Sequence, residues 1–201
     1  MTTMAQRLVL ASASPRRREI LESLGLLFDV LVSDVEEVRA PFEDALAYTQ
    51  RLATSKASAV AERVRVDDPN AVVLGADTVV VADSEVLEKP RNDADGMRML
   101  LSLSGRTHEV ATAFALVHAS RGVIHTGVSI TKVTFRSILA EEAQQYVATG
   151  EGRDKAGGYA VQGIASGFVT RIDGSYANVV GLPASDVLAA LLQRGVVKAW
   201  P

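Results

Sequence analysis

The stretch "LVLASASPRRREIL", residues 8–21, is the part of this sequence that most directly indicates the fold. Leu8 to Ala11 is typical of a short buried strand, and apolar residues at helical spacing follow it. Ser14 suits the N-cap of a helix, and Pro15 fits the first helical position, where its missing N–H costs nothing. The stretch therefore predicts a strand, a tight loop and a helix, the first unit of an α/β fold.

Three consecutive arginines, residues 16–18, fall in the first turn of this helix. The helix dipole is positive at that end and disfavours cations there. One interpretation is a helix start with solvated arginines. The other is an anion site built from free N–H groups, the hydroxyls of Ser12 and Ser14, and guanidinium forks. The clash with the dipole favours the anion site, because a bound polyphosphate would remove the repulsion.

Composition narrows the class of protein. The chain has 201 residues, of which 48% are hydrophobic and 22% charged, with a formal net charge of −3. The basic residues come in small groups, which argues against nucleic acid and indicates a small anionic ligand. The sequence has no cysteine, and it has no apolar run of the length that a signal peptide or a membrane span needs. We therefore expect one cytoplasmic domain, residues 1–201, that acts on small molecules.

Strands and helices alternate early in the chain, and long strands dominate later. We predict a mixed sheet in an α/β fold. The expected strands and hairpin arms are residues 8–11, 26–33, 71–82, 84–90 and two runs within 107–136 that flank a turn at Arg121–Gly122. The expected helices are the one after Ser14 and residues 42–64, 93–103, 141–148 and 184–195. Residues 167–183 are expected to form a strand, a turn at Asp173–Gly174 and a further short strand.

The run "VVLGADTVVV", residues 72–81, places Asp77 and Thr78 between apolar residues on both sides. Turn chemistry alone allows a Gly-Ala-Asp-Thr turn between two strands. The other interpretation is a carboxylate at a strand end that faces a cleft, as a general base or a metal ligand. Lys89, directly before Pro90, adds a cation on a neighbouring loop.

Two further segments carry polar residues of uncertain purpose. Lys56 lies on a row of small residues of the long predicted helix, so it either extends toward solvent or reaches into a site. The segment "DKAGGYAVQGIASGF" is either a flexible surface loop or a wall that contacts a nucleobase, to which Tyr159 and Gln162 are suited. The sequence contains no HExxH, nucleophile elbow, P-loop or dinucleotide fingerprint.

Six segments in register resemble one family, the Maf-type nucleoside triphosphate pyrophosphatases. They are "LASASPRRREIL", "RLATSKA", "GADTVVV" with "VLEKP", "LSGRTHEV", "DKAGGYAVQG" and "GSYANVVGLP", and together they cover nearly the whole chain. Thr78 and Gln162 match the dTTP/UTP branch of that family. The sister branch, which acts on 7-methylguanosine triphosphate, typically has other residues at these two positions.

The resemblance implies hydrolysis of a nucleoside triphosphate to the monophosphate and pyrophosphate with a divalent cation, Mg²⁺ or Mn²⁺. It implies that Asp77 accepts a proton from the attacking water and, together with Glu37 or its neighbour Glu36, binds the metal. It implies that base specificity depends on Arg16, Thr78 and Gln162. The residues expected to bind phosphate are Ser12, Arg17, Lys56 and Lys89.

The family also implies a fold like that of the inosine triphosphate pyrophosphatases, an elongated twisted sheet flanked by helices with two lobes around a cleft. Homodimers are common in it. Two alternatives to a dTTP/UTP pyrophosphatase stay open at this point. One is a pyrophosphatase for a purine or methylated nucleotide, and the other is a non-catalytic nucleotide-binding regulator of septum formation.

Overall fold

The computed structural model describes residues 2–201, and Met1 lies outside the described part. Its main sheet has the order β3-β2-β4-β6-β7-β8, with β5 paired to β4. β2 runs parallel to β3 and β4, whereas β5 and β8 pair antiparallel with their neighbours, so the predicted mixed sheet is confirmed. The strands of this sheet are β2 (Leu8–Leu10), β3 (Asp29–Val30), β4 (Val72–Ala82), β5 (Glu85–Leu87), β6 (Thr107–His118), β7 (Gly122–Phe135) and β8 (Val169–Asp173).

Helices and two short 3₁₀ turns complete the chain. A separate ribbon, which was not predicted from the sequence, pairs β1 (Thr3–Met4) with β9 (Val197–Ala199). No helix within residues 2–201 has the length and apolar character that crossing a membrane requires. The helices are α1 (Pro15–Ser23), α2 (Ala45–Val64), α3 (Asp93–Leu103), α4 (Ala140–Ala148), α5 (Tyr176–Val180) and α6 (Ala184–Gln193), and the 3₁₀ turns are η1 (Ala156–Gly158) and η2 (Ile164–Phe168).

The chain divides into two compact units. The first contains the chain up to Asp77, residues 112–129 and residues 181–201, and the second contains residues 78–111 and 130–180. β4, β6 and β7 each contribute one part to each unit. Two units agree with the two expected lobes, while the cleft and the single-domain description stay predictions.

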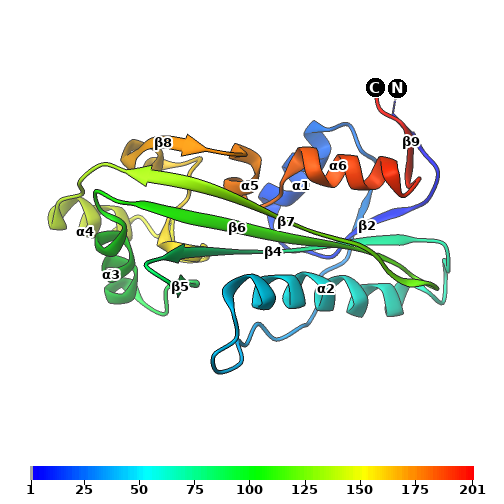
Figure 1. Ribbon diagram of the computed structural model, residues 1–201, viewed down its shortest axis with the longest axis horizontal. Coiled ribbons are helices and arrows are strands. Elements are labelled where there is room, and N and C mark those ends of the chain that lie inside the picture. The colour runs from blue at the N-terminus through cyan, green and yellow to red at the C-terminus, as the bar shows by residue number, and fades with distance from the viewer. Residues whose placement is uncertain (1) are drawn as a thin grey trace. The chain divides into compact units, whose positions relative to one another are not determined.

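The first unit buries both faces of its part of the sheet (Figure 1), with α1 and α6 on one face and α2 on the other. Alternate residues of β2 and β4 therefore enter different cores. Leu8 and Leu10 pack with α1 and α6, whereas Val9 packs with α2. This double burial explains why the strands are nearly continuous apolar runs.

α2 lies very close to β4 at Gly75. A Cβ added there would lie 2.3 Å from the Ala53 carbonyl oxygen and 2.9 Å from the Ala57 Cβ. Glycine is thus required at this position by the close approach of the helix and not by a turn. Because Asp77 lies two residues further along the strand, the sheet presents its side chain on the same face as α2.

The second unit packs α3, α4 and η1 beside its strands. Its core contains an aromatic cluster in which Tyr159 and Phe135 lie edge to face, with ring centroids 4.8 Å apart. Tyr146 and Phe168 form a second edge-to-face pair at 5.5 Å. The buried Tyr159 comes from the glycine-rich segment, so this part of that segment is not a flexible surface loop.

Most of the predicted elements are confirmed, including the helix over 93–103 and the hairpin between β6 and β7. Ser14 is the N-cap of α1 as predicted, but its side chain makes no capping hydrogen bond. The second strand is much shorter than the predicted residues 26–33, because the three-residue β2 offers it only Val9 and Leu10 as partners.

The interpretation of residues 75–78 as a turn is wrong. β4 runs without interruption from Val72 to Ala82, so Asp77 lies in the interior of a long strand and not at its end. The polar pair interrupts the apolar pattern without interrupting the backbone. The change from apolar to polar residues there does not mark a change of chain direction.

The short strand predicted after Asp173–Gly174 is also wrong, because residues 176–180 form α5. The Ser175 hydroxyl accepts a hydrogen bond from the Asn178 N–H at 3.2 Å, which favours a helical turn. The buried Asn178 amide then donates to the Val110 carbonyl and to the Thr131 hydroxyl, each at 2.9 Å. These tertiary hydrogen bonds outweigh the strand propensity of the two valines.

Candidate functional site

A buried carboxylate is the central feature of the first unit. Asp77 is only 8% exposed, although it carries a charged group. A buried charge is costly unless it is paired, and Lys56 of α2 provides the pairing. The Lys56 Nζ donates to the Asp77 Oδ1 at 2.7 Å. The close approach of α2 at Gly75 brings this lysine within reach of the strand.

Lys56 also contacts a second carboxylate. Its Nζ donates to the Glu37 Oε1 at 2.6 Å, and the Lys56 side chain is only 8% exposed. Both glutamates are exposed, and of the two alternatives from the sequence Glu37 is the one that contacts Lys56. One ammonium group holds two carboxylates together, and this agrees with the interpretation that Lys56 reaches into a site.

The environment of Asp77 favours a protonatable carboxyl group. Burial raises its pKa above the ordinary value for an aspartate, and the negative charge of Glu37 adds to that rise. The positive charges of Lys56 and Arg17 oppose it. Burial and a neighbouring carboxylate are the two usual means of raising the pKa of a catalytic base toward neutrality.

The loop before α1 brings a guanidinium group to the same cluster. The Arg17 Nη1 donates to the Ser12 hydroxyl at 3.1 Å, and its Nε donates to the Gly181 carbonyl at 2.8 Å. Burial lowers the pKa of Arg17, while the charges of Asp77 and Glu37 raise it. Arg17 is therefore a fixed, half-buried cation beside the carboxylates and not a solvated residue of the helix start.

The donor set fits a hard divalent cation. The oxygens of Glu37 and Asp77 converge on one Lys56 Nζ, so both carboxylates face the same space. Mg²⁺ is usually held by one or two carboxylates together with substrate phosphates. Within residues 2–201 there is no group of three or more histidine or carboxylate side chains placed to enclose a metal. The fit is therefore to a cation shared with a phosphate ligand.

The second unit holds the predicted site residues Thr78, Lys89 and Gln162, whereas Arg16 lies on α1 in the first unit. Thr78 follows Asp77 in β4 but faces the opposite side of the strand, the side of Val80. A Cβ on Gly157 would lie 2.9 Å from a methyl group of Val80, so this side faces the glycine-rich segment. The Gly157 N–H donates to the Glu88 carbonyl at 3.1 Å. That hydrogen bond ties the glycine-rich segment to the residue before Lys89.

Gln162 is exposed, but the chain on both sides of it is anchored. On one side, the Tyr159 hydroxyl and the His108 Nε2 are 2.8 Å apart in the core. On the other side, the Glu151 carboxylate accepts hydrogen bonds from the Ile164 N–H at 2.9 Å and the Ala165 N–H at 3.3 Å. The segment thus presents an exposed amide from a fixed backbone, as a base-contacting residue requires.

The buried His108 predicts a pH dependence of folding. Burial lowers its pKa from 6.5 to about 4, so the unfolded chain takes up a proton at a higher pH than the folded chain does. Stability is therefore expected to fall as the pH falls from about 6.5 toward 4. Between pH 7 and pH 5 the loss is about 2 kcal/mol. Urea denaturation of the wild type and of His108→Gln at both pH values measures it.

His118 and His125 also have lowered pKa values, so the test is the difference between wild type and variant. We expect His108→Gln to remove most of the extra loss of stability at pH 5. Equal losses in both proteins would show that His108 is not the group responsible.

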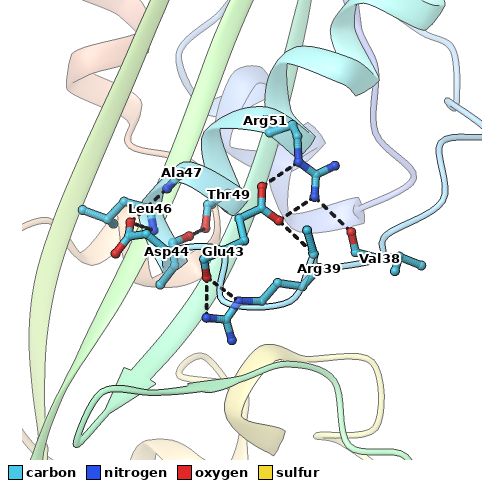
Figure 2. Close-up of polar contacts among 10 residues, drawn as sticks. Val38, Arg39, Glu43, Asp44, Leu46, Ala47, Thr49 and Arg51 are labelled. Atoms are coloured by element: carbon cyan, nitrogen blue, oxygen red, sulfur yellow. Dashed lines mark hydrogen bonds and ion pairs between the residues drawn. The ribbon is translucent and has the colours of Figure 1, made fainter.

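Several residues that no sequence pattern singled out hold the predicted ones in place. His108, Tyr146 and Glu151 anchor the glycine-rich segment. Figure 2 shows a second set around the start of α2, where Arg51 and Glu43 form a double ion pair at 2.7 Å. Arg51 lies in the "RLATSKA" segment, and that segment is the signal by which it could have been found.

The similarity to known proteins extends over nearly the whole chain. Residues 7–194 match the family model of the Maf-like proteins. The dTTP/UTP pyrophosphatase of Vibrio cholerae is 50% identical over 177 residues, which are 88% of this chain and 92% of that protein. The dTTP/UTP pyrophosphatase of Hahella chejuensis is 46% identical over 195 residues, 97% of this chain and 95% of that protein. Among solved structures, the nucleoside-triphosphatase / dITP/XTP pyrophosphatase of Mycobacterium abscessus is 16% identical, with a TM-score of 0.44 and coverage of 94% of both chains.

Proposed function

Because this chain belongs to the Maf-like protein family, we propose that it is a dTTP/UTP pyrophosphatase, which hydrolyses these nucleotides to the monophosphate and pyrophosphate. Relatives of that name are 46% to 50% identical to it over most of its length. The observation that carries the proposal is the buried group of Asp77, Lys56 and Glu37 beside Arg17. A protein that only bound nucleotides would have no need of a buried carboxylate with a raised pKa.

In this proposal Asp77 is the general base. It accepts a proton from the water that attacks the α-phosphorus atom, and the bond between the α and β phosphates breaks. Without a bound cation, burial raises its pKa, which favours uptake of a proton. Lys56 holds the carboxylate in one orientation, as the 2.7 Å hydrogen bond shows. Phosphoryl transfer depends mostly on such positioning and on neutralising the charge that develops.

Cations and hydrogen-bond donors bind the triphosphate. Arg17 offers a fork already oriented by its contacts with Ser12 and Gly181, so little ordering is left for the binding step. The N–H groups at the start of α1 add to the positive field. The proposed phosphate-binding residues are Ser12, Arg17, Lys56 and Lys89.

Base recognition is assigned to Arg16, Thr78 and Gln162. A uracil or thymine edge offers an acceptor, a donor and an acceptor, and the Gln162 amide carries both a donor and an acceptor. The anchoring of the chain at Tyr159 and Glu151 supports this role, because it limits where an exposed amide can reach.

We propose Mg²⁺ or Mn²⁺ as the cofactor, with Glu37 and Asp77 as its protein ligands. Bound there together with phosphate oxygens, the cation would neutralise charge on the leaving pyrophosphate. We place the enzyme in the cytoplasm, with a nucleotide and not a nucleic acid as its partner. The homodimer is the assembly that the family resemblance suggests. The net charge of −3 and the small basic groups support the choice of partner.

A triphosphate panel tests the function. The purified protein is incubated with Mg²⁺ or Mn²⁺ and each of the common ribo- and deoxyribonucleoside triphosphates and 7-methylguanosine triphosphate, and pyrophosphate release is measured. We expect kcat/KM to be highest for dTTP and UTP. A preference for a purine or methylated nucleotide would replace the proposed substrate class. No turnover of any nucleotide would refute the enzyme and favour a nucleotide-binding regulator.

A further inference from the structure

The segment that carries Glu37 has no regular secondary structure. Residues 31–44 form neither helix nor strand, so backbone pairing does not fix the position of Glu37. Three cations of α2 hold this segment instead. The Arg63 Nη1 donates to the Val32 carbonyl at 2.8 Å, the Lys56 Nζ donates to Glu37, and the Arg51 Nη2 donates to the Val38 carbonyl at 3.0 Å.

Arg51 makes the most extensive of these contacts (Figure 2). Its Nε and Nη2 each lie 2.7 Å from an oxygen of the Glu43 carboxylate, a two-point contact that fixes both side chains. The same carboxylate accepts a hydrogen bond from the Ala40 N–H at 3.0 Å. These contacts hold the Glu43 pKa at about 2, so the carboxylate stays ionised at neutral pH.

A second arginine, Arg39, makes a contact across the turn between Val38 and Glu43. The Arg39 Nε donates to the Glu43 carbonyl at 2.9 Å, as Figure 2 shows. Within this turn Phe42 has a φ of +62°, a strained backbone conformation for a phenylalanine. The contacts of Arg39, Glu43 and Arg51 hold residues 38–43 in this conformation against the start of α2.

We propose that Arg51, acting with Glu43, is a positioning residue. It holds the Glu37 carboxylate where it can contact Lys56 and bind the divalent cation. Two consecutive residues of the irregular segment are held by two cations of one helix: Lys56 holds the Glu37 side chain, and Arg51 holds the Val38 carbonyl. Five residues of α-helix separate these cations by about 7.5 Å along the axis, a rigid spacing. This inference rests on the metal site of the proposed function.

The exposure of the Arg51–Glu43 ion pair allows its role in positioning Glu37 to be distinguished from a general contribution to stability. The Arg51 side chain is 44% exposed and the Glu43 side chain 14%, so water reaches the pair through Arg51, and ion pairs open to solvent contribute little to the free energy of unfolding. Residues that orient a metal ligand, in contrast, change metal affinity by about 10- to 100-fold when they are replaced. Loss of Arg51 should therefore affect cation binding much more than folding.

The experiment measures Mn²⁺ binding without nucleotide, by electron paramagnetic resonance of the free ion, together with thermal unfolding. The single variants are Arg51→Ala, Arg51→Lys and Glu37→Gln. The double variant combines Arg51→Ala with Glu37→Gln. Arg65→Ala is the matched control, because Arg65 pairs with Glu62 at the other end of the same helix.

We expect Arg51→Ala to raise the Mn²⁺ Kd about tenfold while Tm changes by less than about 4 °C. Arg51→Lys should lie between wild type and Arg51→Ala, because an ammonium cannot make the two-point contact. Arg65→Ala should leave the Kd unchanged. In the Glu37→Gln background, Arg51→Ala should add nothing, because the side chain that it positions no longer carries a charge.

A Kd for Arg51→Ala within twofold of wild type would overturn the proposal. So would an effect of equal size in the Glu37→Gln background, or a wild type that binds no Mn²⁺. Pyrophosphate release by the wild type is measured separately. A protein that shows the expected Kd values but releases no pyrophosphate would refute the proposed function and leave the role of Arg51 standing.

Discussion

Replacing Asp77 by asparagine is expected to lower kcat for pyrophosphate release from dTTP by about 10²- to 10⁴-fold, the range that a general base contributes. Asparagine has nearly the same volume and can still accept a hydrogen bond from Lys56, but it cannot take a proton from water. Lys56 keeps its ion pair with Glu37 at 2.6 Å, so the fold should persist. Steady-state kinetics and circular dichroism of the purified variant measure the two effects.

A matched control is available in the other compact unit. Asp95 is also a buried aspartate, and it pairs with Arg91 at 3.0 Å and with Arg98 at 3.1 Å. We expect Asp95→Asn to reduce stability and to leave kcat within twofold of wild type. If Asp77→Asn kept more than a tenth of the wild-type kcat, another group would have to be the base.

The sequence allowed the candidate site residues to be predicted, but not the contacts between them. Asp77 was identifiable because a charged residue interrupts an apolar strand on both sides, and burial of such a residue requires a partner. The identity of that partner depends on the distance between α2 and β4 at Gly75. No local pattern encodes a packing distance between segments twenty residues apart, so Lys56 stayed ambiguous until its contacts were known.

The arginines of the first helix show the same limit. Three identical side chains in one turn are equivalent in a pattern, yet the structure turns Arg17 back onto Ser12 and the Gly181 carbonyl. Gly181 lies 164 residues away in sequence. The prediction that Arg16–Arg18 form the start of a helix is confirmed, whereas the different environments of the three residues follow from tertiary contacts.

Replacing Lys56 by methionine is expected to lower the free energy of unfolding by about 3 kcal/mol at pH 8, because it leaves the buried Asp77 carboxylate without its main partner. Methionine fills most of the space of the lysine stem, so the loss arises from charge and not from a cavity. The same replacement in Arg65, whose pair with Glu62 is exposed, should cost less than about 1 kcal/mol. Urea denaturation measures both values.

The pH dependence identifies the cause of that loss. Burial and Glu37 already raise the pKa of Asp77, and Lys56 is the first of the groups that oppose this rise. Without Lys56 the pKa of folded Asp77 rises further above its unfolded value, so the folded variant takes up a proton as the pH falls, and the carboxyl group becomes neutral. The destabilisation by Lys56→Met should therefore be smaller at pH 5 than at pH 8. A loss of equal size at both pH values would show that Lys56 contributes through packing, and the assignment of Asp77 as a base controlled by Lys56 would fail.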